Sequence, residues 1–278
     1  MKTKKQRLTP GLILVYLVLI LGALFMVMPF IWMILTSLKT RPEAVKIPIQ
    51  WLPKSPQWEN YAMLFTRYKF SRYYLNTAIV TVCEVGFQVF TCAMAAYVFA
   101  RLSFPGKNFL FMMCMTVLMV PTQMLMIPRF LITMKLNWLD SLVGIIIPNL
   151  PSIYGCFFLK QHFASLPKEL DESAKLDGCG YFRTFFSILL PLVKSGLVAF
   201  GVLTTLWAWN DMLWPMVVVQ RQSNYVLSIA ISALQGQYSN NMPLLMTAGT
   251  LSMLPMLLVF IIGQRNLLDG IALSGIKG

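Results

Sequence analysis

Six long runs of apolar residues limit what this chain can fold into more than any other feature of its sequence. A helix needs about 20 apolar residues to cross a bilayer core of about 30 Å. Each run approaches or exceeds that length and contains at most one charged residue. The runs cover residues 12–35, 73–100, 108–127, 142–159, 185–209 and 244–263.

These runs predict an all-α, polytopic membrane protein with six transmembrane helices, organised as a single transmembrane domain over residues 1–278. Lipid offers no partner to backbone N–H and C=O groups, and a helix pairs them internally. The strands of a β-barrel would instead alternate polar and apolar residues over about ten positions. The composition agrees, because 57% of the residues are hydrophobic and 12% are charged, about half of the ~25% typical of soluble domains.

The positive charge of the chain points to membrane lipid rather than to nucleic acid. The formal net charge is +13, but Lys and Arg are scattered between the apolar runs, whereas a nucleic-acid binder gathers them on one face. Basic loops suit anionic lipid headgroups. A basic cluster precedes the first run, so the positive-inside rule predicts that, with six spans, both termini are cytoplasmic. The cluster consists of Lys2, Lys4, Lys5 and Arg7.

The residues that most enzymes need are missing from the sequence. His162 is the single histidine and the five cysteines form no C-x-x-C pair, so we expect no metal site. Neither a G-x-x-x-x-G-K-[ST] phosphate loop nor a G-x-S-x-G nucleophile motif occurs. We therefore expect no catalytic residue, no bound cofactor and no ATP hydrolysis by this chain.

Glu84 is the one acidic residue inside the six runs. Insertion scales put the cost of a charge at mid-membrane at roughly 2.5–3.5 kcal/mol, so the residue needs a reason to be there. One interpretation is a proton or cation relay, which would make the chain an ion- or proton-coupled secondary transporter. The other is a protonated or hydrogen-bonded carboxyl group that holds helices together, with Gln88, one helical turn away, as a candidate partner.

Acidic residues gather in the loop 165–184, between the fourth and fifth runs. Pro167 suits the first turn of a helix, and Gly178 suits the left-handed position that ends one. Three acidic residues, Glu169, Asp171 and Glu172, lie near the positive end of the expected helix dipole. The pattern predicts a short helix, which is either a solvated loop helix or a rigid knob that docks into a cleft on another protein.

The order of residues in this loop resembles a known motif. Glu172-Ser173-Ala174-x-x-Asp177-Gly178, followed by Ile188-Leu189-Leu190-Pro191, is similar to the E-A-A…G loop of ATP-binding-cassette importer permeases, with Ser173 where the motif usually has Ala. Segments along nearly the whole chain resemble the sugar-importer branch of the maltose-system type. They include Trp51-Leu52-Pro53, residues 96–106, Trp209-Asn210-Asp211 and the tail 275–278.

The resemblance implies a permease subunit, not an enzyme, in the inner or plasma membrane of a prokaryote. Such a permease pairs with a second permease subunit, as a heterodimer, and works with two cytoplasmic ATPase subunits that hold the ATP and Mg²⁺. An extracellular sugar-binding protein delivers an oligosaccharide or disaccharide. The short loop helix would be a coupling helix docked on the ATPase, and its coupling residues would be Glu172, Ser173, Ala174, Asp177 and Gly178.

Helix breakers indicate where a substrate path could run. Pro121 lies in the third run, and Pro148 and Pro151 flank Asn149 in the fourth. Broken helices at membrane depth line protein or water-filled paths, although kinks that only aid packing are an equal alternative. Sugars need hydrogen bonds and aromatic faces, so the path candidates are Gln123, Asn149, Trp209 and Asn210. Ordinary interface positions are the alternative for the tryptophans.

Overall fold

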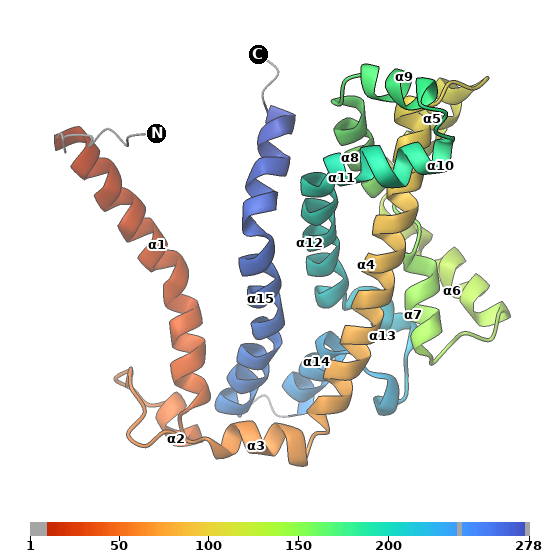
Figure 1. Cartoon of the computed structure of the whole chain (residues 1–278). Coiled ribbons are helices and arrows are strands. Elements are labelled where there is room, and N and C mark those ends of the chain that lie inside the picture. The colour runs from red at the N-terminus through yellow and green to blue at the C-terminus, as the bar shows by residue number, and fades with distance from the viewer. Residues whose placement is uncertain (1–9, 238–240, 276–278) are drawn as a thin grey trace. The chain divides into compact units, whose positions relative to one another are not determined.

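The computed structural model describes residues 10–237 and 241–275, and this part of the chain contains helices without strands (Figure 1). The basic cluster before residue 10 and the tail 276–278 lie outside the described residues. The chain divides into two compact units. The first comprises Met1–Lys69 with Ala233–Met253, and the second comprises Phe70–Ser232 with Leu254–Gly278.

The first unit is built around the C-terminal end of its long helix. Its helices are α1 (Pro10–Ser37), α2 (Arg41–Ala44), α3 (Glu59–Thr66) and the beginning of α15 (Met242–Gly275). Asn60 Nδ2 donates to the carbonyl oxygens of Ser37 at 2.8 Å and of Lys39 at 3.1 Å. The buried Lys39 Nζ donates to Gln50 O at 2.6 Å. The Asn60 side chain thus satisfies backbone oxygens at and just beyond the C-terminal end of α1, and Lys39 satisfies a loop carbonyl.

The second unit surrounds α4, which packs most extensively against α8 and α12. Buried Ala93 and Ala96 of α4 share a core cluster with Leu159 and Phe163 of α8 and Phe200 of α12. Small residues on α4 let neighbouring helices approach closely, as is usual between helices in a membrane. The elements are α4 (Phe70–Arg101), α5 (Lys107–Val117), η1 (Thr122–Leu125), α6 (Met126–Lys135), α7 (Leu142–Asn149), α8 (Ile153–Ala164), α9 (Glu169–Leu176), α10 (Tyr181–Arg183), the π-helical η2 (Thr184–Leu189), α11 (Leu190–Leu192), α12 (Lys194–Asn210), α13 (Leu213–Val218), η3 (Gln222–Asn224) and the start of α14 (Leu227–Gln237).

Three helices among the described residues are long and apolar enough to cross a membrane, and three bent pairs raise the number to six if each pair is one span. The long helices are Pro10–Ser37, Phe70–Arg101 and Met242–Leu267. The bent pairs are Lys107–Val117 with Thr122–Lys135 at 90°, Leu142–Asn149 with Ile153–Ala164 at 45°, and Tyr181–Leu192 with Lys194–Val218 at 78°. This pattern supports the predicted all-α polytopic fold.

The breaks interrupt three of the six apolar runs. In the run 108–127, the helix α5 ends at Val117. Pro121, directly before η1, has ψ 129°, which is not a helical backbone angle, so the helix is interrupted there. The run 142–159 divides between Asn149 and Ile153, where Ser152 Oγ accepts from Gly155 N at 3.1 Å and caps the new helix. Hydropathy predicts how long an apolar span is, but it does not predict where the span bends.

Asp140 joins two loops of the second unit. Its Oδ1 accepts from the backbone N–H groups of Arg221 at 2.9 Å and Gln220 at 3.1 Å, and Oδ2 pairs with Arg221 Nε at 2.5 Å. The N–H of Arg221, with the other donors, holds the pKa of this carboxyl below its usual value. The contacts fix the entry into α7 against the exit from α13, two elements that frame the pocket described below.

We predict that Gly155→Ala destabilises the chain. An added Cβ at Gly155 would lie 2.1 Å from Phe200 Cζ, where no carbon fits unless the ring moves. Overpacking of this kind costs about 1–3 kcal/mol, so the thermal unfolding midpoint of the purified chain should fall. Gly86→Ala is the matched control, because nothing lies within 4 Å of its added Cβ. Equal midpoints for the two variants would contradict the packing described for α8 and α12.

Candidate functional site

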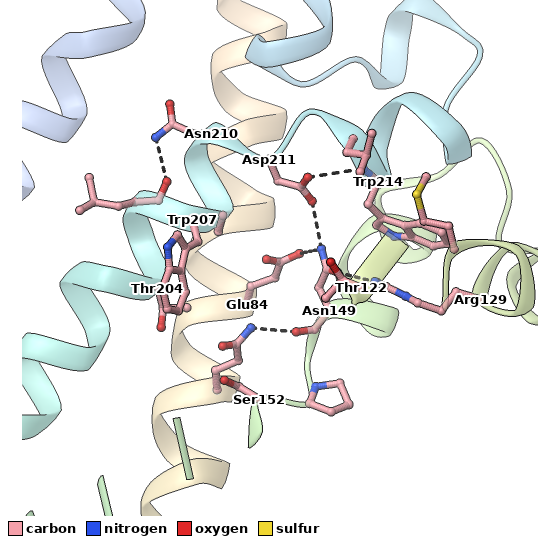
Figure 2. A pocket seen from close by; sticks show the side chains of 16 residues that line it. Glu84, Thr122, Arg129, Asn149, Ser152, Thr204, Trp207, Asn210, Asp211 and Trp214 are labelled. Atoms are coloured by element: carbon pink, nitrogen blue, oxygen red, sulfur yellow. Dashed lines mark hydrogen bonds between the residues drawn. The ribbon is translucent and has the colours of Figure 1, made fainter. Parts of the chain in front are cut away.

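A pocket of about 820 Å³ lies in the second unit where several helix breaks meet (Figure 2). Its walls come from α4, from the turn η1 and α6, and from the α7–α8 and α12–α13 breaks. The lining residues are Glu84, Gln88, Thr122, Met126, Arg129, Asn149, Pro151, Ser152, Thr204, Leu206, Trp207, Ala208, Asn210, Asp211, Leu213 and Trp214. Ligand sites of membrane transporters are often formed at such discontinuous helices.

Asn149 is the centre of the polar cluster in this pocket. Its Nδ2 donates to Glu84 Oε1 at 3.0 Å and, at the longer distance of 3.4 Å, to Asp211 Oδ2. Its Oδ1 accepts from Arg129 Nη2 at 2.6 Å. Figure 2 shows the side chains of Glu84, Arg129 and Asp211 converging on this amide. A single neutral side chain therefore links two carboxyl groups to one guanidinium group.

Neighbouring contacts hold this cluster in place. The guanidinium carbon of Arg129 lies 4.3 Å from the centre of the Trp214 ring, within the range of a cation–π interaction. Trp214 Nε1 donates to Gly144 O at 3.1 Å, and Ser228 Oγ donates to Asp211 O at 2.6 Å. The ring nitrogen of Trp214 and the backbone oxygen of Asp211 are thus paired inside the chain, as membrane depth requires.

The structure gives Glu84 a partner that helix spacing did not identify. Gln88 Nε2 donates to the backbone oxygen of Asn149 at 2.8 Å, while the carboxyl group of Glu84 accepts from the side chain of the same residue. Sequence reasoning also missed Arg129 and Asp211. A signal was present, because each charge lies two residues beyond the end of an apolar run, and Arg129 follows Pro128.

The four path candidates separate in the structure. Asn149 and Asn210 line the pocket, whereas Gln123 and Trp209 do not. Trp209 is buried, with its ring 5.9 Å from that of Tyr74, and Gln123 is exposed on the turn η1. Two other tryptophans, Trp207 and Trp214, line the pocket, and Trp207 is the more exposed of the two; its side chain packs edge-on against Tyr154 at 5.2 Å.

The loop 165–184 contains the expected short helix, α9, which lies beside the C-terminal end of α4 (Figure 1). Gly178 has φ +73°, a conformation that favours glycine, and Cys179 N donates to Ala174 O at 2.8 Å to close the helix. Glu172, Ser173 and Asp177 are exposed on this chain. Ala174 is 2% exposed and faces the interior of the chain itself.

Arg101, the last residue of α4, connects α4 to the loop 165–184 through hydrogen bonds and an ion pair. Its guanidinium group donates to Leu166 O at 2.8 Å and Pro167 O at 2.5 Å, and it forms an ion pair with Asp171 of α9. The Arg101 side chain is 4% exposed. A buried, planar donor that meets several acceptors holds its partners in one orientation. The acidic face of α9 is therefore fixed relative to α4.

We predict that Asn149→Leu destabilises the purified chain more than Asn210→Leu. The first change removes the hydrogen-bond partner of Glu84 and Arg129, and buried polar groups left unpaired cost about 1–3 kcal/mol. Asn210 Nδ2 donates at 2.8 Å to Leu206 O of its own helix. Thermal unfolding of both variants in detergent gives the comparison. Equal losses would show that Asn149 does not organise the pocket.

Known proteins share both the sequence and the fold. Residues 89–272 match the family described as binding-protein-dependent transport system inner membrane component. An arabinooligosaccharides transport system permease protein of Bacillus subtilis is 30% identical over 92% of each chain. A diacetylchitobiose uptake system permease protein of Streptomyces coelicolor is 30% identical over 91% of this chain and 85% of the relative.

The crystal structure of a bacterial ABC transporter involved in the import of the acidic polysaccharide alginate matches with a TM-score of 0.82. The match covers 94% of this chain and 99% of that one at 19% identity, which supports the fold. The predicted resemblance to ABC importer permeases is confirmed, and the ion-coupled alternative built on Glu84 is not favoured. This chain is a multi-pass membrane subunit, not an enzyme, and it belongs to the family of binding-protein-dependent transport system inner membrane components.

Proposed function

We propose that this chain is a permease subunit of an ATP-driven carbohydrate importer. In this proposal an extracellular binding protein delivers an oligosaccharide or disaccharide, a second permease completes the path as a heterodimer, and two cytoplasmic ATPase subunits supply the energy. The names of the relatives support a carbohydrate substrate, since they refer to arabinooligosaccharides and diacetylchitobiose. Residues 1–278 act as one transmembrane permease domain.

The loop 165–184 is proposed as the ATPase-docking site, with Glu172, Ser173, Asp177 and Gly178 on the contact. The attachment of α9 to the end of α4 by Arg101 carries this proposal. Ala174 faces this chain, so its proposed coupling role is to let α9 lie close to its own scaffold. A rigid attachment means that any displacement of α9 by the ATPases moves α4 as well.

The same helix α4 carries Glu84 and Gln88 of the pocket. Closure of the ATPases would therefore displace α4, and this uninterrupted helix would transmit the displacement to the pocket. The helix breaks around the pocket would act as hinges. ATP shifts the balance between inward- and outward-facing states only by its difference in affinity for the two. Glu84 acts in this scheme as a structural hydrogen-bond acceptor.

The docking proposal fixes the orientation of the chain. The loop 165–184 lies in the cytoplasm, and both termini lie on that same side of the inner or plasma membrane of a prokaryote. The basic cluster at residues 2–7 supports this orientation through the positive-inside rule.

We predict that Asp177→Lys releases the ATPase. Reversing an exposed charge on the docking face places like charges against a surface built for the opposite sign, which costs affinity. A tagged wild-type chain should co-purify with an ATPase and a second permease, and the variant should lose the ATPase. Glu59→Lys makes the same reversal at an exposed acidic residue of α3 and should retain both partners. An ATPase that stays with Asp177→Lys would contradict docking at this loop.

Arg101→Gln should give a different defect. Arg101 is buried and outside the docking face, so we expect the ATPase to co-purify normally while carbohydrate uptake falls about tenfold or more. Asp171→Asn keeps an acceptor oxygen but removes the charge, and its effect on uptake should be smaller. Loss of the ATPase from Arg101→Gln would mean that the residue supports docking itself and not transmission.

A further inference from the structure

Two lysines of the second unit lie at the same edge of its apolar runs. Lys107 directly precedes the run 108–127, and Lys160 directly follows the run 142–159. Consecutive spans alternate in direction, so the first of these runs begins on the side of the membrane where the second ends. Helix α5 also packs against α8 in the fold. Both ammonium groups therefore lie where apolar helices meet the lipid headgroups.

The structure brings the two side chains together at the start of α5. Lys160 Nζ lies 3.8 Å from the centre of the Phe111 ring, and Phe111 is one helical turn beyond Lys107 on the same face of α5. The positive charges of Lys160 and Lys168 repel that of Lys107. None of these three lysines forms an ion pair within residues 10–237 and 241–275.

Donors remain available on Lys107 and Lys160. Lys107 Nζ donates to Leu102 O at 2.7 Å, which uses one of the three N–H donors of an ammonium group. Lys160 Nζ contacts the face of an aromatic ring and makes no hydrogen bond in the part of the chain that the structure describes. Lys168 directly precedes the acidic residues of α9, so we assign the ligand contacts to the other two lysines.

A shallow depression borders Lys107 at the turn between α4 and α5. It has a volume of about 330 Å³ and is lined by Ser103, Phe104, Gly106, Lys107, Asn108 and Phe109. Ser103 and Asn108 are exposed, and a hydroxyl and a side-chain amide can both donate to phosphate oxygens. The depression therefore offers neutral donors beside the two cations.

An apolar surface continues from this depression along α5. Phe109, Met112 and Met113 are each more than half exposed in this chain. They lie on the helix that begins at Lys107, so a ligand with an anionic head and a hydrocarbon tail matches both parts of the surface. A soluble phosphate would match the lysines alone.

We propose that Lys107 and Lys160 bind the phosphate of an anionic membrane lipid, whose acyl chain lies on Phe109 and Met112. The negative headgroup meets two ammonium groups that no carboxylate neutralises, whereas a zwitterionic lipid would bring a cation of its own to the same place. The inference requires only that this chain lies in a membrane, and it goes beyond the proposed carbohydrate function.

Native mass spectrometry of the full-length chain in detergent tests the proposal by measuring bound lipid as lipid is added. The probes are phosphatidylglycerol and phosphatidylcholine with identical acyl chains, which share the phosphate and differ in the net charge of the headgroup. Half-saturation with phosphatidylglycerol is expected at about one tenth of the concentration that phosphatidylcholine needs, equivalent to about 1.4 kcal/mol.

The double variant Lys107→Gln/Lys160→Gln should reduce this preference to about twofold or less. Its matched control is Lys46→Gln/Lys135→Gln, which removes the same charge at two exposed lysines outside the depression and should keep the full preference. Lys107 also holds the turn through Leu102 O. Lys160→Gln alone leaves that hydrogen bond in place and should still reduce the preference to about threefold.

Four outcomes would overturn the proposal. Equal half-saturation by the two lipids, or a preference that the lysine variants retain, would remove the charged site. Displacement of phosphatidylglycerol by an equal concentration of glycerol phosphate would make the ligand a soluble phosphate. Loss of the preference in a chain that co-purifies with a second permease would mean that the partner subunit covers these lysines.

Discussion

The second unit depends on one constraint, that helix breaks at membrane depth must find hydrogen-bond partners within the protein. The break after Asn149 is satisfied by Gln88, which donates to the freed carbonyl, and by Ser152, which caps the next helix. The break at Asp211 is satisfied by Ser228. Because these breaks lie beside α4, the side chains that pair them also create the polar wall of a pocket.

Helix α4 and its neighbours differ in continuity. Helix α4 runs without interruption over 32 residues, whereas three neighbouring apolar segments bend by 45° to 90°. An unbroken helix transmits displacement along its axis, and the bends are the places where backbone angles can change. With Arg101 at one end and Glu84 on its length, α4 connects the loop 165–184 to the pocket.

The sequence predicts the elements better than the contacts between them. Apolar length and proline positions are local properties, and they indicate the spans, the short helix in the loop 165–184 and two of the breaks. The partner of Glu84 is not local: Asn149 lies 65 positions away, and helix spacing favoured Gln88 instead. Arg129 and Asp211 went unassigned because each lies two residues beyond the end of an apolar run, and their contacts with Asn149 are made 20 and 62 positions away in the sequence. Ala174 matched a motif, but only the fold shows which side of α9 it occupies.

The placement of acidic residues connects these observations. The chain has ten Asp and Glu residues against 23 Lys and Arg, and six of the ten lie in two places, the loop 165–184 and the pocket. In the loop the carboxyl groups are largely hydrated, and this placement carries little energetic cost. In the pocket Glu84 is buried, and its carboxyl group accepts a hydrogen bond from Asn149, which in turn accepts from Arg129. Asn149 therefore holds the acidic group of α4 beside the break between α7 and α8.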